Sequence, residues 1–167
     1  MIEYIKPTVE DAAEIVAFYN RVGGETSYLS FEQDEYPLTV EEQREAIERD
    51  AQDDSQYMLL VKDEGRIIAI GTMTTSHKIK ARHVTELGIV VEKAQHSKGI
   101  GTILMKKLIQ WAREQPFITK IRLDTRADNL KAVALYIKLG FVIEGTLKNE
   151  TYWNDQYFDL YVMGKDV

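Results

Sequence analysis

Two glycines one residue apart, Gly99 and Gly101, stand between an apolar strand-like run at residues 87–91 and a stretch whose apolar residues repeat at helical spacing. The first N–H groups of a helix are unpaired and carry partial positive charge, and a missing β-carbon lets an anion approach them closely. Lys98 adds a full positive charge beside the glycines. The spacing predicts a phosphate-binding cradle, with a structural turn as the alternative, because Gly-x-Gly is common at strand–helix junctions.

This cradle differs from two better-known phosphate motifs. A dinucleotide-binding fingerprint requires a third glycine at the position of Leu104, and a nucleoside-triphosphate loop ends in Gly-Lys-Ser/Thr, which is missing here. The expected ligand therefore carries phosphates without being NAD or ATP. Gly88, inside the preceding strand, indicates a bulge or a close approach of another group to the backbone.

Composition limits the classes of function. The 167 residues carry a net charge of -6, which argues against a nucleic-acid partner bound on a basic face. The absence of cysteine excludes disulfides, thiolate metal sites and cysteine nucleophiles, and it is typical of a reducing compartment. Neither a signal peptide nor a membrane-spanning apolar run is recognised, so a cytoplasmic protein with no membrane partner is expected. The three histidines, His77, His83 and His96, lack metal-ligand spacing, so no metal is expected.

The elements that must position the cradle follow from the apolar pattern. Two capping-box pairs, Thr8 with Asp11 and Thr39 with Glu42, mark helix starts, and Gly140 marks a helix end. Glu64-Gly65 predicts a tight turn between two antiparallel strands. The predicted element order is β-α-α-β-β-β-α-β-α-β-β, which corresponds to a single α+β domain over residues 1–167, built around a mixed sheet.

Two segments carry a resemblance to a known family. One is His96-Ser97-Lys98-Gly99-Ile100-Gly101, and the other runs from Asn129 through Ala132 and Leu135-Tyr136 to Gly140-Phe141. Together with the element order over almost the whole chain, they resemble the GNAT family of N-acetyltransferases, in which a strand leads into Gln/Arg-x-x-Gly-x-Gly/Ala. The resemblance implies a GNAT-like, mostly antiparallel central sheet flanked by helices. It also implies an enzyme that transfers the acetyl group of acetyl-CoA to a primary amine.

The same resemblance implies the coenzyme contacts. Backbone amides of the loop and helix start would hold the pyrophosphate, namely those of His96, Ser97, Lys98, Gly99, Ile100, Gly101 and Thr102. His96 departs from the family's usual Gln or Arg, so a side-chain contact at that position is open. Strand-end N–H groups around Ile89, Val90 and Val91 would hydrogen-bond the acetyl carbonyl and the pantetheine amides, with a bulge near Gly88 opening room for this arm. Asn129 and Ala132 would contact the same arm.

Tyr136 is the expected catalytic acid. It lies seven residues after Asn129, which is two helical turns, so the two side chains share a helix face. Amine acetylation needs an unprotonated amine, a polarised thioester carbonyl and a proton for the leaving thiolate. By resemblance Tyr136 supplies or stabilises that proton. From the residues alone, a core aromatic at helical spacing is the alternative.

The acceptor site is harder to place. Glu86 lies two residues before Gly88 and on the same strand face, and some family members use a Glu on this strand, so Glu86 is a candidate base and substrate contact; a surface carboxylate fits the pattern equally. By analogy, Glu25, Tyr28 and Phe31, in the loop between the first two helices, are expected to line the acceptor pocket.

Three functions stay open. A small amine is the leading acceptor, and the alternative is a protein N-terminus or lysine, for which aromatic residues at 151–153 and 157–163 could line a peptide groove. Tyr157 and Asp159 could also reach the cleft. The third function is that of a non-catalytic acyl-CoA sensor. The resemblance adds a homodimer as an option, because the aromatic C-terminal strands offer apolar surface.

Overall fold

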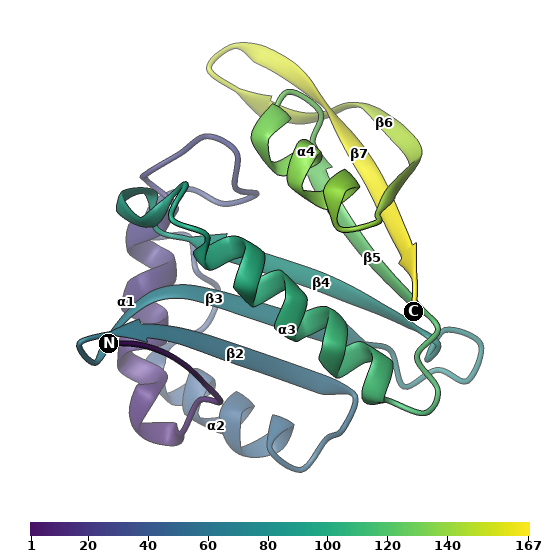
Figure 1. Cartoon of the computed structure of the whole chain (residues 1–167). Helices are drawn as coiled ribbons and strands as arrows, with labels where there is room; N and C mark the ends of the chain where they lie inside the picture. The colour runs from purple at the N-terminus through teal and green to yellow at the C-terminus, as the bar shows by residue number, and fades with distance from the viewer.

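The computed structural model describes residues 1–167, and its centre is a seven-stranded sheet in the order β1-β2-β3-β4-β5-β7-β6 (Figure 1). The observed element order confirms the predicted α+β fold. The elements are β1 (Ile2–Ile5), the 3₁₀ turn η1 (Val9–Asp11), α1 (Ala12–Val22), α2 (Val40–Asp50), β2 (Gln56–Asp63), β3 (Arg66–Thr75), β4 (Val84–Val91), the 3₁₀ turn η2 (Lys93–Gln95), α3 (Ile100–Glu114), β5 (Lys120–Arg126), α4 (Leu130–Lys138), β6 (Val142–Trp153) and β7 (Gln156–Asp166).

Helices cover both faces of the sheet, α1 and α2 on one and α3 and α4 on the other (Figure 1). Because side chains alternate along a strand, β2 and β3 contribute buried residues to two apolar cores, one on each face of the sheet. Leu87 and Leu123 pack towards α3 and α4, whereas Ile70 packs towards α1. None of the helices is both long enough and apolar enough to cross a membrane.

The two predicted capping pairs hold helix starts in place. Glu42 N donates to Thr39 Oγ1 at 3.2 Å, and Thr39 N donates to Glu42 Oε2 at 2.8 Å, so each residue satisfies an orphan amide of the other at the start of α2. Thr8 N donates to Asp11 Oδ2 at 2.7 Å in the same way, although the chain there makes one 3₁₀ turn before α1 begins.

The feature that positions the candidate site is the only parallel strand pair, β4 with β5. These strands pair from Val84 opposite Lys120 to Glu86 opposite Arg122, and beyond that point they diverge (Figure 1). Strand β5 keeps its other partner, β7, along its whole length. The sheet therefore opens into a wedge between β4 and β5.

The predicted bulge near Gly88 is wrong, because β3 and β4 stay in regular register from Thr75–Thr85 to Ala69–Val91. The wedge opens at the other edge of β4 and needs no extra residue. Gly88 instead marks a close approach: a β-carbon there would lie 2.7 Å from Thr72 Oγ1 on the neighbouring strand. A close approach to the backbone is the other possibility that a glycine inside a strand indicates.

Candidate functional site

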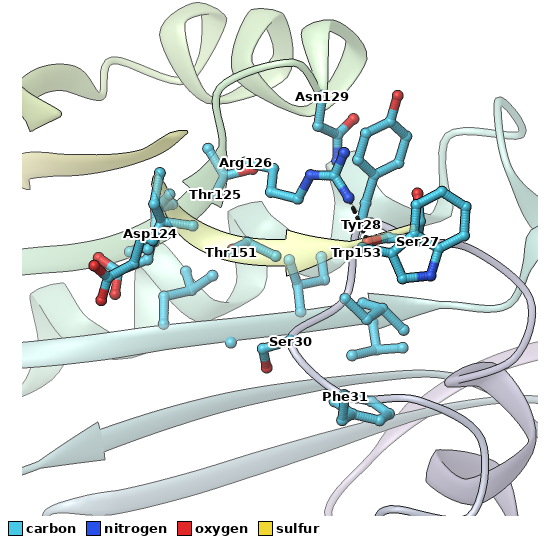
Figure 2. Close-up of a pocket in the computed structure, with 18 of the residues that line it drawn as sticks. Ser27, Tyr28, Ser30, Phe31, Asp124, Thr125, Arg126, Asn129, Thr151 and Trp153 are labelled. Atoms are coloured by element: carbon cyan, nitrogen blue, oxygen red, sulfur yellow. Dashed lines mark hydrogen bonds between the residues drawn. The ribbon is translucent and has the colours of Figure 1, made fainter. Parts of the chain in front are cut away.

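A cleft of about 810 Å³ fills the wedge. Most of its lining comes from four parts of the chain: the diverging strands β4 and β5, the start and last turn of α4, the loop between α1 and α2, and the far end of β6 (Figure 2). Its lining from these parts consists of residues 86–90, residues 123–126, Asn129, Tyr136, residues 27–32, Glu35 and residues 150–153. Segments more than a hundred residues apart in the sequence therefore meet at one site.

The exposed edge of β4 presents backbone amides to this cleft. Glu92 N donates to Ile68 O at 3.0 Å, and in an antiparallel pair the hydrogen-bonding direction alternates along the strand. The amides of Ile89 and Val91 therefore turn away from β3, towards the wedge, where no strand partner is present. The amide of Val90 turns towards β3, so Val90 lines the cleft with its side chain rather than through the predicted backbone contact.

The predicted cradle lies where this strand leads into α3. Gly99 is the N-cap of α3 with φ of 83°, a left-handed conformation that favours glycine. The first helical bond runs from Ile103 N to Gly99 O, so the amides of Ile100, Gly101 and Thr102 have no partner inside the helix. A β-carbon at Gly101 would meet only Val91 Cγ2, at 3.8 Å. The helix start therefore offers three amides without a partner inside the helix and no β-carbon at Gly101 to crowd them, as a pyrophosphate site requires.

Side chains hold the loop before the cradle in shape. The His96 Nε2–H donates to Val91 O at 2.9 Å, which ties the loop to the end of β4. Lys131 Nζ of α4 donates to Ser97 Oγ at 2.7 Å, which brings a second lysine beside the cradle in addition to Lys98. No local sequence pattern indicates Lys131, because its proximity to the cradle depends on how α4 packs beside the loop.

The buried carboxylate of Glu92 fixes the start of this loop through hydrogen bonds from two arginines. Only 3% of Glu92 is exposed, and its carboxylate receives hydrogen bonds from Arg66 (2.5 and 2.9 Å) and Arg21 (3.1 Å). Burial alone would raise the pKa of this carboxyl, but the hydrogen bonds from Arg66 and Gln95 and the two arginine charges outweigh it and hold the pKa below its usual range. The residue that directly precedes η2 is therefore fixed to both β3 and α1.

Tyr136 and Asn129 reach the cleft from α4, as their spacing predicted. Tyr136 is 8% exposed, packs against Phe141 and lines the cleft. Burial raises the pKa of its phenol to about 12, so it keeps its proton at neutral pH. Asn129 Oδ1 caps α4 by accepting from Ala132 N at 3.4 Å, which leaves the amide nitrogen of Asn129 free to face the cleft.

Glu86 lies on the opposite face of the sheet from Tyr136. Its neighbour Leu87 packs into the core beneath α3, so Glu86 points to the side covered by α1 and α2, and it lines the cleft there. Its side chain is 57% exposed, and its carboxylate lies 3.5 Å from Arg122 Nη2. The cleft thus has a phenol on one face and a carboxylate on the other.

The predicted acceptor residues separate into two groups. Tyr28 and Phe31 line the cleft, on the same side as Glu86. Glu25 does not line it: Glu25 Oε2 accepts from Lys93 N at 2.8 Å and so ties the start of this loop to the segment after β4. Tyr157 and Asp159 lie outside the lining as well, and β6 contributes Tyr152 and Trp153 instead.

Arg126, at the end of β5, lines the cleft although no sequence motif indicates it. It is 4% exposed, pairs with both oxygens of Asp128 (3.0 and 2.7 Å) and donates from Nη1 to Ser27 O at 2.7 Å (Figure 2). Its guanidinium also lies 3.7 Å from the ring centroid of Phe158 and 5.0 Å from that of Tyr28. Arg126 therefore connects the loop between α1 and α2, residues 23–39 and here called the acceptor loop, across the cleft to β5.

Comparisons with known proteins agree with this geometry. A sequence model of the acetyltransferase (GNAT) family matches residues 25–141. The crystal structure of a GNAT-family acetyltransferase from Streptococcus pneumoniae superposes with a TM-score of 0.96 over 100% of both chains, at 34% identity. A Salmonella typhimurium structure that contains its cofactor acetyl-CoA shares the fold, with a TM-score of 0.84 and 18% identity over 99% of this chain and 94% of that chain.

A curated relative extends the match. L-amino acid N-acetyltransferase AaaT of Escherichia coli (strain K12) is 29% identical over 102 residues. The matched part is 61% of this chain and 63% of that relative, so the chain spans somewhat less than two thirds of the relative's length. The family match covers most of the chain and includes the cradle, the wedge and Tyr136. The chain belongs to the GNAT family of acetyltransferases.

Proposed function

We propose that this protein is an N-acetyltransferase that moves the acetyl group of acetyl-CoA onto a primary amine of a small molecule. The observation that carries the proposal is the wedge itself, where unpaired strand amides lie between a protonated phenol on one face and a carboxylate on the other. Family membership supports the cosubstrate, and the Salmonella typhimurium structure contains it.

The free groups of the protein match the parts of acetyl-CoA. The pyrophosphate would rest on the amides of Ile100, Gly101 and Thr102, with Lys131 beside them. The pantetheine arm carries amide groups, and it can lie along β4 as an added strand would, bonded to the amides of Ile89 and Val91. Asn129 would bind the arm from the other side of the wedge. In this pose the thioester reaches the cleft between β4 and β5.

The two substrates would then meet from opposite faces of the sheet. The nitrogen lone pair of the amine attacks the thioester carbonyl, the C–S bond breaks, and the acetyl group ends on nitrogen. Tyr136 gives a proton to the departing sulfur, and Glu86 accepts the surplus proton of the amine, directly or through water. A phenol whose pKa is raised to about 12 is protonated at neutral pH, as a proton donor must be.

The shape of the cleft favours a small acceptor. A volume of about 810 Å³ falls within the range of small-molecule sites, and the coenzyme arm fills part of it. Arg126 holds the acceptor loop across the opening. Relatives of this chain are named for the acetylation of L-amino acids, spermidine and streptothricin, which are all small molecules.

The test is thiol release from acetyl-CoA in the presence of a panel of amines, with mass spectrometry of the product. We expect release that depends on both the protein and an amine, together with a product heavier by one acetyl group. Binding of acetyl-CoA without transfer to any amine or peptide of the panel would contradict the proposal and favour an acyl-CoA sensor.

A further inference from the structure

The acceptor half of the cleft is strongly acidic. Among the lining residues, Arg126 is the only lysine or arginine, and the carboxylates are Glu32, Glu35, Glu86, Asp124 and Glu150. The charge of Arg126 is already matched by Asp128, with which it forms a bidentate pair. The cleft therefore presents an uncompensated negative field to whatever enters it.

These carboxylates differ in how well they are neutralised. Glu86 and Asp124 share one cation, Arg122, whose Nη2 lies 3.5 and 3.9 Å from them. Glu32, Glu35 and Glu150 have no cationic side chain within 4.0 Å, although Glu35 Oε2 accepts a hydrogen bond from Glu32 N at 2.6 Å. The first two belong to the loop after α1, and Glu150 belongs to β6, so carboxylates without a cationic partner come from two separate parts of the cleft lining.

Aromatic side chains lie in the same half of the cleft. Tyr28 and Phe31 come from the loop that carries Glu32, and Trp153 comes from the strand that carries Glu150 (Figure 2). An aromatic wall next to carboxylates suits an alkyl or sugar chain that carries ammonium groups, because rings pack on the chain and attract cations. It does not suit a carboxylate.

Building on the proposed function, we propose that the acceptor carries at least two amino groups, one that reacts and one that remains a cation. The reacting amine lies beside Glu86 in the wedge, and the distal ammonium is held by Glu32, Glu35 and Glu150 at the opening. An α-amino acid is disfavoured, since its carboxylate would face these groups and Arg126 already has its partners. The substrate class is thus a diamine, a polyamine or an amino sugar with several amines.

The test compares acceptors of one length that differ only in the charge at the far end. For chains of four to eight carbons we would measure kcat/KM for the α,ω-diamine, the monoamine and the ω-amino acid. The diamine is expected to be the best substrate and the ω-amino acid the worst. The preference should shrink as salt rises, because these carboxylates are exposed and mobile ions screen them.

Variants locate the preference in the protein. Each of Glu32→Gln, Glu35→Gln and Glu150→Gln should lower kcat/KM for the diamine by about two- to fivefold more than kcat/KM for the monoamine. In the triple variant, the kcat/KM values for the diamine and the monoamine should become nearly equal. Glu48→Gln is the matched control, because Glu48 is an exposed carboxylate on α2 outside the cleft, and it should change neither value.

The outcomes separate this inference from the proposed function. Acetylation of monoamines or ω-amino acids as efficient as that of diamines would overturn the dication inference and leave the transferase standing. Loss of diamine preference in the Glu48→Gln control would also overturn it. Acetyl-CoA binding without transfer to any acceptor would overturn the transferase. In that case, calorimetry of diamine against monoamine binding to the CoA complex still tests the acidic opening.

Discussion

The two halves of the cleft are built from different kinds of chemical group. The half proposed to bind the coenzyme, here called the coenzyme half, offers backbone groups: the amides of Ile89 and Val91 along β4 and those that open α3 at Gly101. The acceptor half uses side chains, among them Glu32 from the loop after α1 and Trp153 from β6. A backbone surface depends on the fold alone, so it suits a part of the reaction that never changes. A side-chain surface can change with each substitution.

The gap between the halves is set by strand pairing rather than by any special residue. Strand β5 follows β7 along its whole length and leaves β4 after Glu86. Each edge of the wedge therefore keeps one ordinary partner, and only the facing edges lack one. The unpaired edges give the site its free amides at no cost to the core on either face of the sheet.

A single substitution at Gly101 should strongly weaken the binding of acetyl-CoA. In Gly101→Glu a carboxylate would lie against the pyrophosphate, and acetyl-CoA affinity should fall by about 100-fold. Gly101→Ala is the control, because its β-carbon finds only ordinary contact with Val91, so the fold should keep its melting temperature and the affinity should fall less. Calorimetric titration with acetyl-CoA measures both. A folded Gly101→Glu protein with unchanged affinity for acetyl-CoA would show that the cradle does not bind the pyrophosphate.

Removing the hydroxyl of Tyr136 should slow acetyl transfer strongly while leaving acetyl-CoA binding nearly unchanged. Tyr136→Phe retains the ring packed against Phe141 and loses only the hydroxyl, so kcat should fall by about 100-fold while the affinity for acetyl-CoA stays within about twofold. Steady-state kinetics and calorimetry separate the two effects. If kcat stays near that of the unchanged protein, Tyr136 is not the acid.

The ion pairs of Glu92 with Arg66 and Arg21, next to the cradle, should make the stability of the protein depend on acidic pH. Because the pKa of Glu92 is held below the usual 4.5, its contribution to stability is complete above that pH and is lost as the pH falls through the lowered pKa. Glu92→Gln should reduce the free energy of unfolding at pH 7 by about 1–3 kcal/mol.

Urea unfolding at several pH values checks this contribution to stability. The difference between Glu92→Gln and the unchanged protein should narrow as the pH drops below 4.5, whereas Glu48→Gln should track the unchanged protein throughout. A difference that is constant from pH 7 to acid conditions would contradict the ion-pair explanation.

The smallest expected effect belongs to Lys131. Lys131→Met removes the charge beside Ser97, so the dissociation constant of acetyl-CoA should rise by about two- to fivefold at low salt and less at high salt. The control is Lys106→Met, an exposed lysine on α3 away from the loop. An equal effect in both variants would mean that only the net charge of the protein matters.

The same contrast explains what could be predicted from the sequence. The cradle and the order of elements follow from local signals, such as the glycine spacing at Gly99 and Gly101 and the caps at Thr8 and Thr39, and the structure confirms the element order. Tyr136 reaches the cleft, as its position on one helix face with Asn129 required. Its role as the acid stays a prediction.

Only part of the acceptor half could be predicted: Tyr28, Phe31 and Glu86 do line the cleft, but its other contacts follow no local pattern. Arg126 stands at the end of an alternating strand, and its contact with Ser27 joins residues that are 99 positions apart. Glu25 is suited to a cation by type, yet its carboxylate is used by the amide of Lys93. The wedge was expected from a bulge at Gly88, whereas it depends on the pairing of β5 with β7, which no single strand reveals.

The proposed function depends on binding of acetyl-CoA to the backbone half of this cleft. Calorimetric titration of the purified protein with acetyl-CoA, free CoA and ATP measures that binding. We expect one site per chain with micromolar affinity for acetyl-CoA and CoA and much weaker binding of ATP, which lacks the pantetheine arm that β4 would hold. Failure of acetyl-CoA to bind, or binding of ATP with equal affinity, would contradict it.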